Sequence, residues 1–133
     1  MAQTQSPTNE GYGEIGKIVA GEASTPVNKV GGLKTACTAN EAQTYAGVTW
    51  CTESGLTVVA ADTVVSSQTT VANDTVELDH VFTAGEVVTV KGFGILNTDG
   101  DVLFALCCFA ADVPLQVSDT LTTEMKMQFK LGS

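Results

Sequence analysis

The strict alternation of apolar and polar side chains near the end of the sequence constrains its fold more than any other feature. Between Leu121 and Leu131 one set of alternate residues is mainly apolar, and the other is polar or charged: Thr122, Glu124, Lys126, Gln128 and Lys130. Successive side chains of a β-strand point to opposite faces. A period of two therefore predicts a strand with one face in the core and one in water. The pair Ser118-Asp119 supplies the turn before it.

Further strands are expected upstream, each bounded by turn residues. Thr75 to Phe82 alternates, and Val87 to Leu96 is rich in β-branched residues. Asn97 to Gly100 is a turn, and Val102 to Phe109 is apolar on both faces, as in a strand buried in a sandwich or at a subunit contact. With two shorter candidates, Val48–Thr52 and Leu56–Ala60, the pattern predicts an all-β fold: an antiparallel β-sandwich or jelly-roll-like domain over residues 46–133.

The first third of the chain gives weaker indications. Residues Met1 to Gly13 are polar and without periodicity, which predicts an extended, flexible N-terminal arm. Glu14 to Ala20 suggests a first strand, and Gly21 to Gly32 has the composition of a loop. We therefore expect residues 1–45 to form an N-terminal arm and an irregular segment, with no helix longer than a single turn.

Composition and charge exclude several classes of protein. Hydrophobic residues make up 44% of the chain and charged residues 16%, a balance typical of a folded domain. The net charge is −9, from 15 acidic and 6 basic residues, so a basic face for direct nucleic acid binding is not expected. The polar residues Met1 to Gly11 do not resemble a signal peptide, and no apolar run is long enough to span a bilayer. We expect no membrane partner.

The four cysteines, Cys37, Cys51, Cys107 and Cys108, contain no CxxC pair. In a strand, Cys107 and Cys108 point to opposite faces, so they are not expected to pair with each other. A bridge between Cys37 and Cys51 is left open by the sequence, although reduced thiols are the expectation. A zinc site would need clustered Cys and His ligands, and none is present.

No pattern of residues predicts catalysis. His80, the only histidine, falls on the apolar face of its strand, and its neighbour Asp79 faces the other way, which predicts a structural or interfacial histidine. The segment Asn97 to Asp101 resembles the start of a calcium loop but lacks the later glutamate, so a hairpin turn explains it. We predict no catalytic, cofactor-binding or metal-binding residues, no cofactor, and a protein that is not an enzyme.

One resemblance to a known family extends over about the last ninety residues. Val87 to Phe104, the turn Val117 to Leu121, the strand to Leu131 and the segment Asp62 to Gln68 resemble a stretch common in structural proteins of tailed viruses. In that family a strand enters a glycine-containing turn and a second strand, and an alternating strand ends the pattern. The chain departs from it at Lys91, where an acidic residue is usual, and at Ala105 or Leu106, where arginine is common.

The resemblance implies a virion component, assembled in the host cytoplasm. The leading expectation is a head decoration (cement) protein that binds and stabilises the lattice of the major capsid protein, and itself forms a homo-oligomer, with a trimer as one option. The alternatives are a tail, neck or fibre component that binds another virion protein, and a ligand- or carbohydrate-binding β-sandwich module. Aromatics at 6% and a single tryptophan, Trp50, make the stacking face of a carbohydrate-binding module hard to build.

Overall fold

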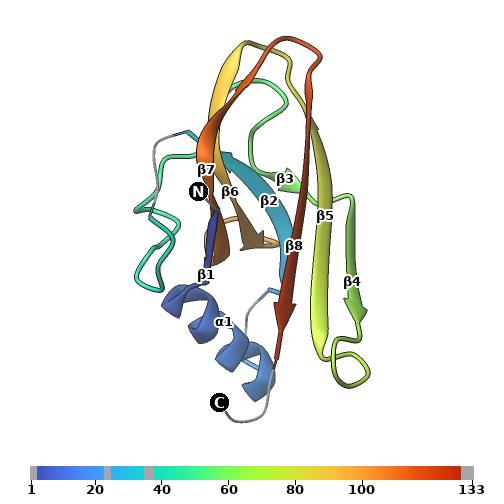
Figure 1. Ribbon diagram of the computed structural model, residues 1–133. Coiled ribbons are helices and arrows are strands. Elements are labelled where there is room, and N and C mark those ends of the chain that lie inside the picture. The colour runs from blue at the N-terminus through green and yellow to red at the C-terminus, as the bar shows by residue number, and fades with distance from the viewer. Residues whose placement is uncertain (1–2, 23–24, 35–37, 130–133) are drawn as a thin grey trace.

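The computed structural model describes residues 3–22, 25–34 and 38–129 and shows an all-β, sandwich-like domain with one short helix (Figure 1). Its elements are β1 (Thr4–Pro7), α1 (Asn9–Ala20), β2 (Val27–Leu33), β3 (Val59–Ala60), β4 (Thr63–Ser67), β5 (Thr75–Thr83), β6 (Val88–Asn97), β7 (Leu103–Leu115) and β8 (Thr120–Gln128). The predicted fold class is confirmed.

The strands form two antiparallel sheets. A five-stranded sheet has the order β1-β7-β6-β2-β3, and a three-stranded sheet has the order β4-β5-β8. Residues from both sheets meet in one apolar core, which includes Phe82 from β5, Ile95 from β6 and Met125 from β8. Each strand contributes alternate side chains to this core, which explains why apolar and polar residues alternate in the sequence.

The strands expected between residues 75 and 131 are confirmed, with small changes at their ends. β5, β6 and β8 match the predicted ranges closely, and β8 keeps an unbroken register with β5 from Thr120 to Gln128. Leu131, the expected end of the last strand, lies outside the described residues. β7 continues to Leu115, beyond the predicted limit. It lies between β1 and β6 and is buried on both faces from Leu103 to Cys108, so this part of it is an interior strand of the sandwich.

The expected N-terminal arm is wrong for the part of it that the structure describes. β1 pairs with β7 from Thr4↔Cys108 to Pro7↔Ala105, and α1 follows at once. Thr8 caps the helix: its hydroxyl oxygen accepts a hydrogen bond from the Gly11 amide at 3.0 Å, and its own hydroxyl donates to the Leu103 carbonyl. The helix ends at Gly21, whose φ of 75° is the left-handed conformation of a C-terminal cap.

Three further expectations in the first half are wrong. The range Glu14 to Ala20 is helical and not a strand, and Gly21 to Gly32 contains most of β2, which pairs with β6. Val48 to Thr52 forms no strand, although Trp50 makes an isolated bridge to Leu33. Since β1 and β2 belong to the same sheet as β6 and β7, the first 45 residues contribute to the sandwich itself.

A loop covers the outer face of the five-stranded sheet. Trp50 stacks on Tyr45 with ring centroids 5.7 Å apart, and its indole N–H donates to the Tyr45 carbonyl at 3.0 Å. A side chain at Gly94 would lie 2.8 Å from the Trp50 ring, so the glycine lets the indole rest on the strand. Leu33, Leu103, Leu106 and Cys108 fill this second apolar cluster.

The cysteines divide between the two faces as expected. Cys107 points into the main core and Cys108 into the outer cluster. Cys51 and Cys107 are free thiols, so Cys51 does not form the bridge that the sequence left open; Cys37 lies outside the described residues. Cys108 is disulfide-bonded, so the expectation of reduced thiols is wrong for this residue. The one helix of the described residues is too short and too polar to cross a membrane.

Candidate binding groove

An apolar groove of about 330 Å³ runs along one side of the sandwich, between the edges of the two sheets. We call it the β8 groove. It is lined by residues of β1, α1, β7 and the end of β8: Gln5, Ser6, Pro7, Tyr12, Ile15, Phe104, Ala105, Met125, Lys126, Met127, Gln128 and Phe129. Tyr12 and Phe129 remain 55% and 47% exposed. The groove thus offers aromatic and methionine side chains, which adapt well to a bound chain.

One wall of the groove is the outer edge of β8. Among the described strands, β8 pairs only with β5. The Phe129 amide donates to the Asp74 carbonyl at 2.8 Å, and this pair belongs to the same register as Met127↔Val76 and Met125↔Leu78. In an antiparallel ladder the hydrogen-bonded pairs alternate. The odd-numbered residues of β8 therefore bond to β5.

The even-numbered residues of β8 consequently turn their backbone groups outward. The N–H and C=O groups of Thr122, Glu124, Lys126 and Gln128 point away from β5, toward the groove side of the sheet. On β5, the even-numbered residues bond to β8 and the odd-numbered residues face β4. The Asp79 carbonyl agrees with this alternation, since it accepts a hydrogen bond from the Asp62 amide. β8 thus presents a nine-residue edge without a bulge or a proline.

The opposite wall, β1, is a much poorer edge. The Thr8 amide donates to the Phe104 carbonyl at 3.1 Å, so the even-numbered residues of β1 face β7. Only Gln5 and Pro7 face outward, and Pro7 has no N–H to donate. Short edges ending in proline are a common protection against unwanted strand pairing. Of the two strands that wall the groove, β8 is therefore the one at which a further strand can add.

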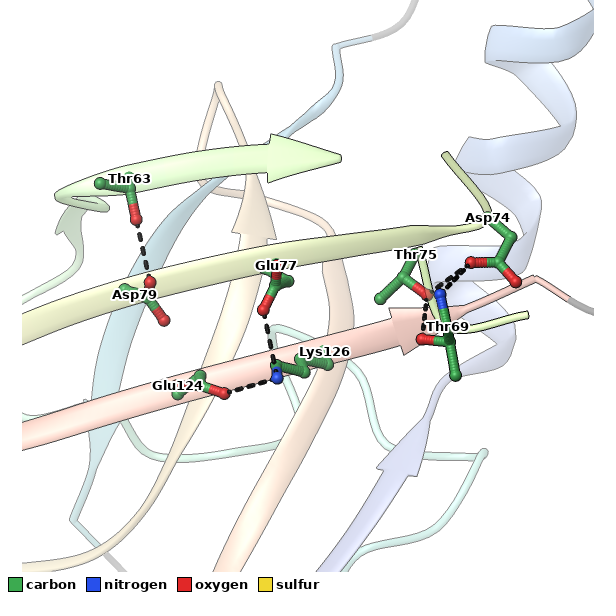
Figure 2. A network of polar contacts seen from close by, with 8 residues as sticks. All are labelled: Thr63, Thr69, Asp74, Thr75, Glu77, Asp79, Glu124 and Lys126. Atoms are coloured by element: carbon green, nitrogen blue, oxygen red, sulfur yellow. Dashed lines mark hydrogen bonds and ion pairs between the residues drawn. The ribbon is translucent and has the colours of Figure 1, made fainter. Parts of the chain in front are cut away.

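The outer face of β5 and β8 carries an acidic row beside this edge (Figure 2). Lys126 lies 3.3 Å from both Glu77 and Glu124, and the hydrogen bonds to Glu77 and Glu124 raise the pKa of Lys126. Asp79 accepts a hydrogen bond from the Thr63 hydroxyl at 3.1 Å and lies directly opposite Glu124 in the ladder. Like charges in that position repel. One ammonium group thus serves two carboxylates of the row, and Asp79 has only the Thr63 hydroxyl.

Asp74 fixes the loop against which β8 ends. Its carboxylate accepts hydrogen bonds from the amides of Thr69, Thr70 and Val71 and from the side chain of Gln128. The Thr69 amide, followed by the other loop amides, holds the pKa of Asp74 far below its usual range. The Thr75 hydroxyl also donates to it, as Figure 2 shows. Asp74 therefore anchors the end of the strand that forms the groove wall.

His80 lies away from the groove. Its Nδ1 is 3.1 Å from Asp62, its ring meets Phe82 edge-on at 4.5 Å, and its carbonyl accepts from the Thr123 hydroxyl. The Asp62 carboxylate also accepts from the Val81 amide. The sequence singled out Asp79 as the neighbour of His80 and missed Asp62, which strand pairing brings close from eighteen residues away. These contacts tie β5 to the start of β4, which is a structural role.

The Asn97 to Asp101 segment is a hairpin turn. The Asn97 side chain is buried; it accepts from the amides of Asp101 and Val102 and donates to the Asp101 carboxylate at 2.9 Å. These groups satisfy one another within the turn. Across residues 3–22, 25–34 and 38–129 no three His, Cys, Asp or Glu side chains gather in a group suited to a metal ion.

Comparison with known proteins gives no relative: no family model, no curated protein and no solved structure matches the chain. The groove itself was not predicted from the sequence. Its β1 wall comes from residues that pattern alone assigned to a flexible arm. The Thr8 cap and Gly21 were the available indications of a helix at that position.

Proposed function

We propose that this chain is a non-enzymatic structural protein of a virus particle, and foremost a decoration (cement) protein that binds the major capsid protein. The resemblance supports the viral class, since the stretches that carry it fall on β4, the β6–β7 hairpin and β8. The single observation that supports a binding role is the long edge of β8, which no other described strand pairs with, beside an apolar groove. Exposed strand edges recruit other chains unless they are protected.

The polar residues that were candidates for a catalytic or metal-binding role all have structural roles. His80 and Asp62 join two strands, Asp74 organises a loop, and Asn97 closes a turn. Each of these side chains makes hydrogen bonds that hold the fold together. This favours a protein that acts by binding another protein. Our proposal places it in the virion, after assembly in the host cytoplasm.

Quantitative mass spectrometry of purified virus particles, from a culture that expresses this gene, tests the proposal. A stoichiometry near one copy per major capsid protein, or a simple fraction of it, indicates a decoration protein on the head lattice. A few copies per particle would indicate the neck, tail or fibres. Absence of the chain from purified particles would contradict the virion proposal.

A further inference from the structure

We propose that the β8 groove binds an extended segment of another protein, which adds as a strand to the outer edge of β8. The inference deepens the proposed function, because it names how this binding protein holds its partner. Strand addition uses backbone hydrogen bonds for affinity and side-chain pockets for selectivity. Both are present on β8, in the outward groups of Glu124, Lys126 and Gln128 and in the apolar groove beside them.

The parity of β8 dictates the chemistry of the added strand. Residues directly opposite one another in neighbouring strands share a face. Side chains opposite Glu124 and Lys126 would therefore lie on the outer, acidic face, and alternate ones would point into the groove. The groove side chains, with Met125 and Met127 at the wall and Phe104 beneath, require apolar partners.

The acidic row selects the charge of the outer residues. Glu124 already faces Asp79 across the ladder, and Lys126 divides its ammonium group between Glu77 and Glu124. A basic side chain opposite Glu124 would relieve this repulsion, and the net charge of −9 attracts a basic segment over longer range. The occupant is therefore a segment in which apolar residues alternate with lysine, arginine or small polar residues.

The groove fits a single strand better than a second copy of the chain. Its other walls are β1, the edge strand of the five-stranded sheet, and the helix α1, and both lie opposite the β8 edge across the groove (Figure 1). A single added strand would lie along β8, in the groove between β8 and these two elements. A whole second sandwich, joined edge to edge through β8, would have to place its own β1 and α1 in the same region.

The test is the binding of a fluorescein-labelled synthetic peptide in which valine alternates with lysine and threonine, measured by fluorescence polarisation. Two matched peptides carry N-methyl groups, one on every lysine and threonine and the other on every valine. Only one set of amides can face β8, so we expect one methylated peptide to lose affinity at least about tenfold and the other to retain it. Equal affinity of both for the protein, or no binding of the unmethylated peptide, would overturn the proposal.

Variants of the protein locate the site. Lys126→Pro removes one outward N–H and none that bonds to β5, while Lys126→Gln removes the same charge and keeps the N–H. We expect at least about tenfold weaker binding for the proline variant and at most a small change for the glutamine variant. Equal affinities in both folded variants would overturn the β8 assignment; if Lys126→Pro does not fold, the methylated peptides decide.

Sedimentation velocity of the chain alone tests the other occupant. A dimer that dissociates in Lys126→Pro would show that a second copy fills the edge, against the proposal. Because these assays need no virus particle, they are independent of the mass spectrometry. If the chain binds the peptide but is absent from particles, the groove proposal stands and the virion proposal is rejected. If the chain is present in particles but does not bind the peptide, the virion proposal stands and the groove proposal is rejected.

Discussion

Two adjacent threonines of β8 provide a matched test of which edge of the strand is open. Thr122 and Thr123 are neighbours in one regular strand, yet the Thr123 amide faces the His80 carbonyl on β5 and the Thr122 amide faces outward. Replacing each by proline removes one N–H and fixes φ in the same way. The two variants differ mainly in the edge that they alter, and in the greater burial of Thr123.

The expected costs differ because only one substitution leaves a buried acceptor without donors. Thr123→Pro removes the ladder bond and the hydroxyl bond of 2.9 Å to the His80 carbonyl. A lost hydrogen bond costs about 1 kcal/mol and the unsatisfied carbonyl about 1–3 kcal/mol more, which gives about 3 kcal/mol. Thr122→Pro exchanges a solvated N–H for a ring on an edge strand, at a cost of about 0–1 kcal/mol.

Urea titration followed by the fluorescence of Trp50, the only tryptophan, measures the difference directly. With a slope of about 1–3 kcal/mol per M, the midpoint of Thr123→Pro should lie about 1–2 M below that of Thr122→Pro. Equal midpoints, or a lower one for Thr122→Pro, would refute the assignment of the open edge.

Three other predictions concern the elements that frame the groove and the core. The depressed pKa of Asp74 means that its carboxylate stabilises the fold above about pH 4, its unfolded pKa, and that this contribution is lost as the pH falls. The urea midpoint of the wild type should therefore fall between about pH 5 and 3 more steeply than that of Asp74→Asn, and parallel curves would contradict this. Gly11→Ala should destabilise the protein by about 1–3 kcal/mol, because the new methyl group would lie 2.7 Å from the β7 backbone. Gly16→Ala, on the exposed part of the same helix with open space around it, should stabilise it by about 0.5–1 kcal/mol, and thermal melts that show the same sign for both would exclude this packing of α1. Burial raises the pKa of Cys51 to about 11 and also raises that of Cys107, so neither thiol should react with iodoacetamide at pH 8 until urea unfolds the chain. Rapid alkylation of the native protein, located by peptide mapping, would show that these thiols are accessible.

The later strands were predictable because burial alone determines their pattern. β8 lies with one face on the core and the other in water, so its sequence alternates, with Thr123 as the one polar residue on the core side. From Leu103 to Cys108, β7 is covered on both faces, by the core and by the loop around Trp50, and this part of its sequence is correspondingly apolar. Asn97 to Gly100 was predicted as a turn because asparagine and glycine favour turn conformations. The structure agrees, since Gly100 has a φ of 75°.

The N-terminal elements were not predictable because tertiary contacts override weak local preferences. α1 contains three glycines, which disfavour helix in isolation. The helix forms because Gly11 allows it to approach β7 closely, and because the Glu10 carboxylate accepts from the amides of Leu103 and Tyr45. The glycines of β2 gave the same misleading impression of a loop, although Gly31 lies beneath Trp50 within a paired strand. The groove depends on both segments, so no local pattern could have indicated it.

The central claim is that β8 offers an open edge to a partner, and residue-resolved amide hydrogen exchange by NMR tests it most directly. In the free protein we expect slow exchange at Met125 and Met127, which bond to β5, and fast exchange at Glu124 and Lys126. Addition of the valine–lysine peptide should slow Glu124 and Lys126 and leave the other two unchanged. Slow exchange at all four amides in the free monomer, or no change on saturation with the peptide, would contradict the account.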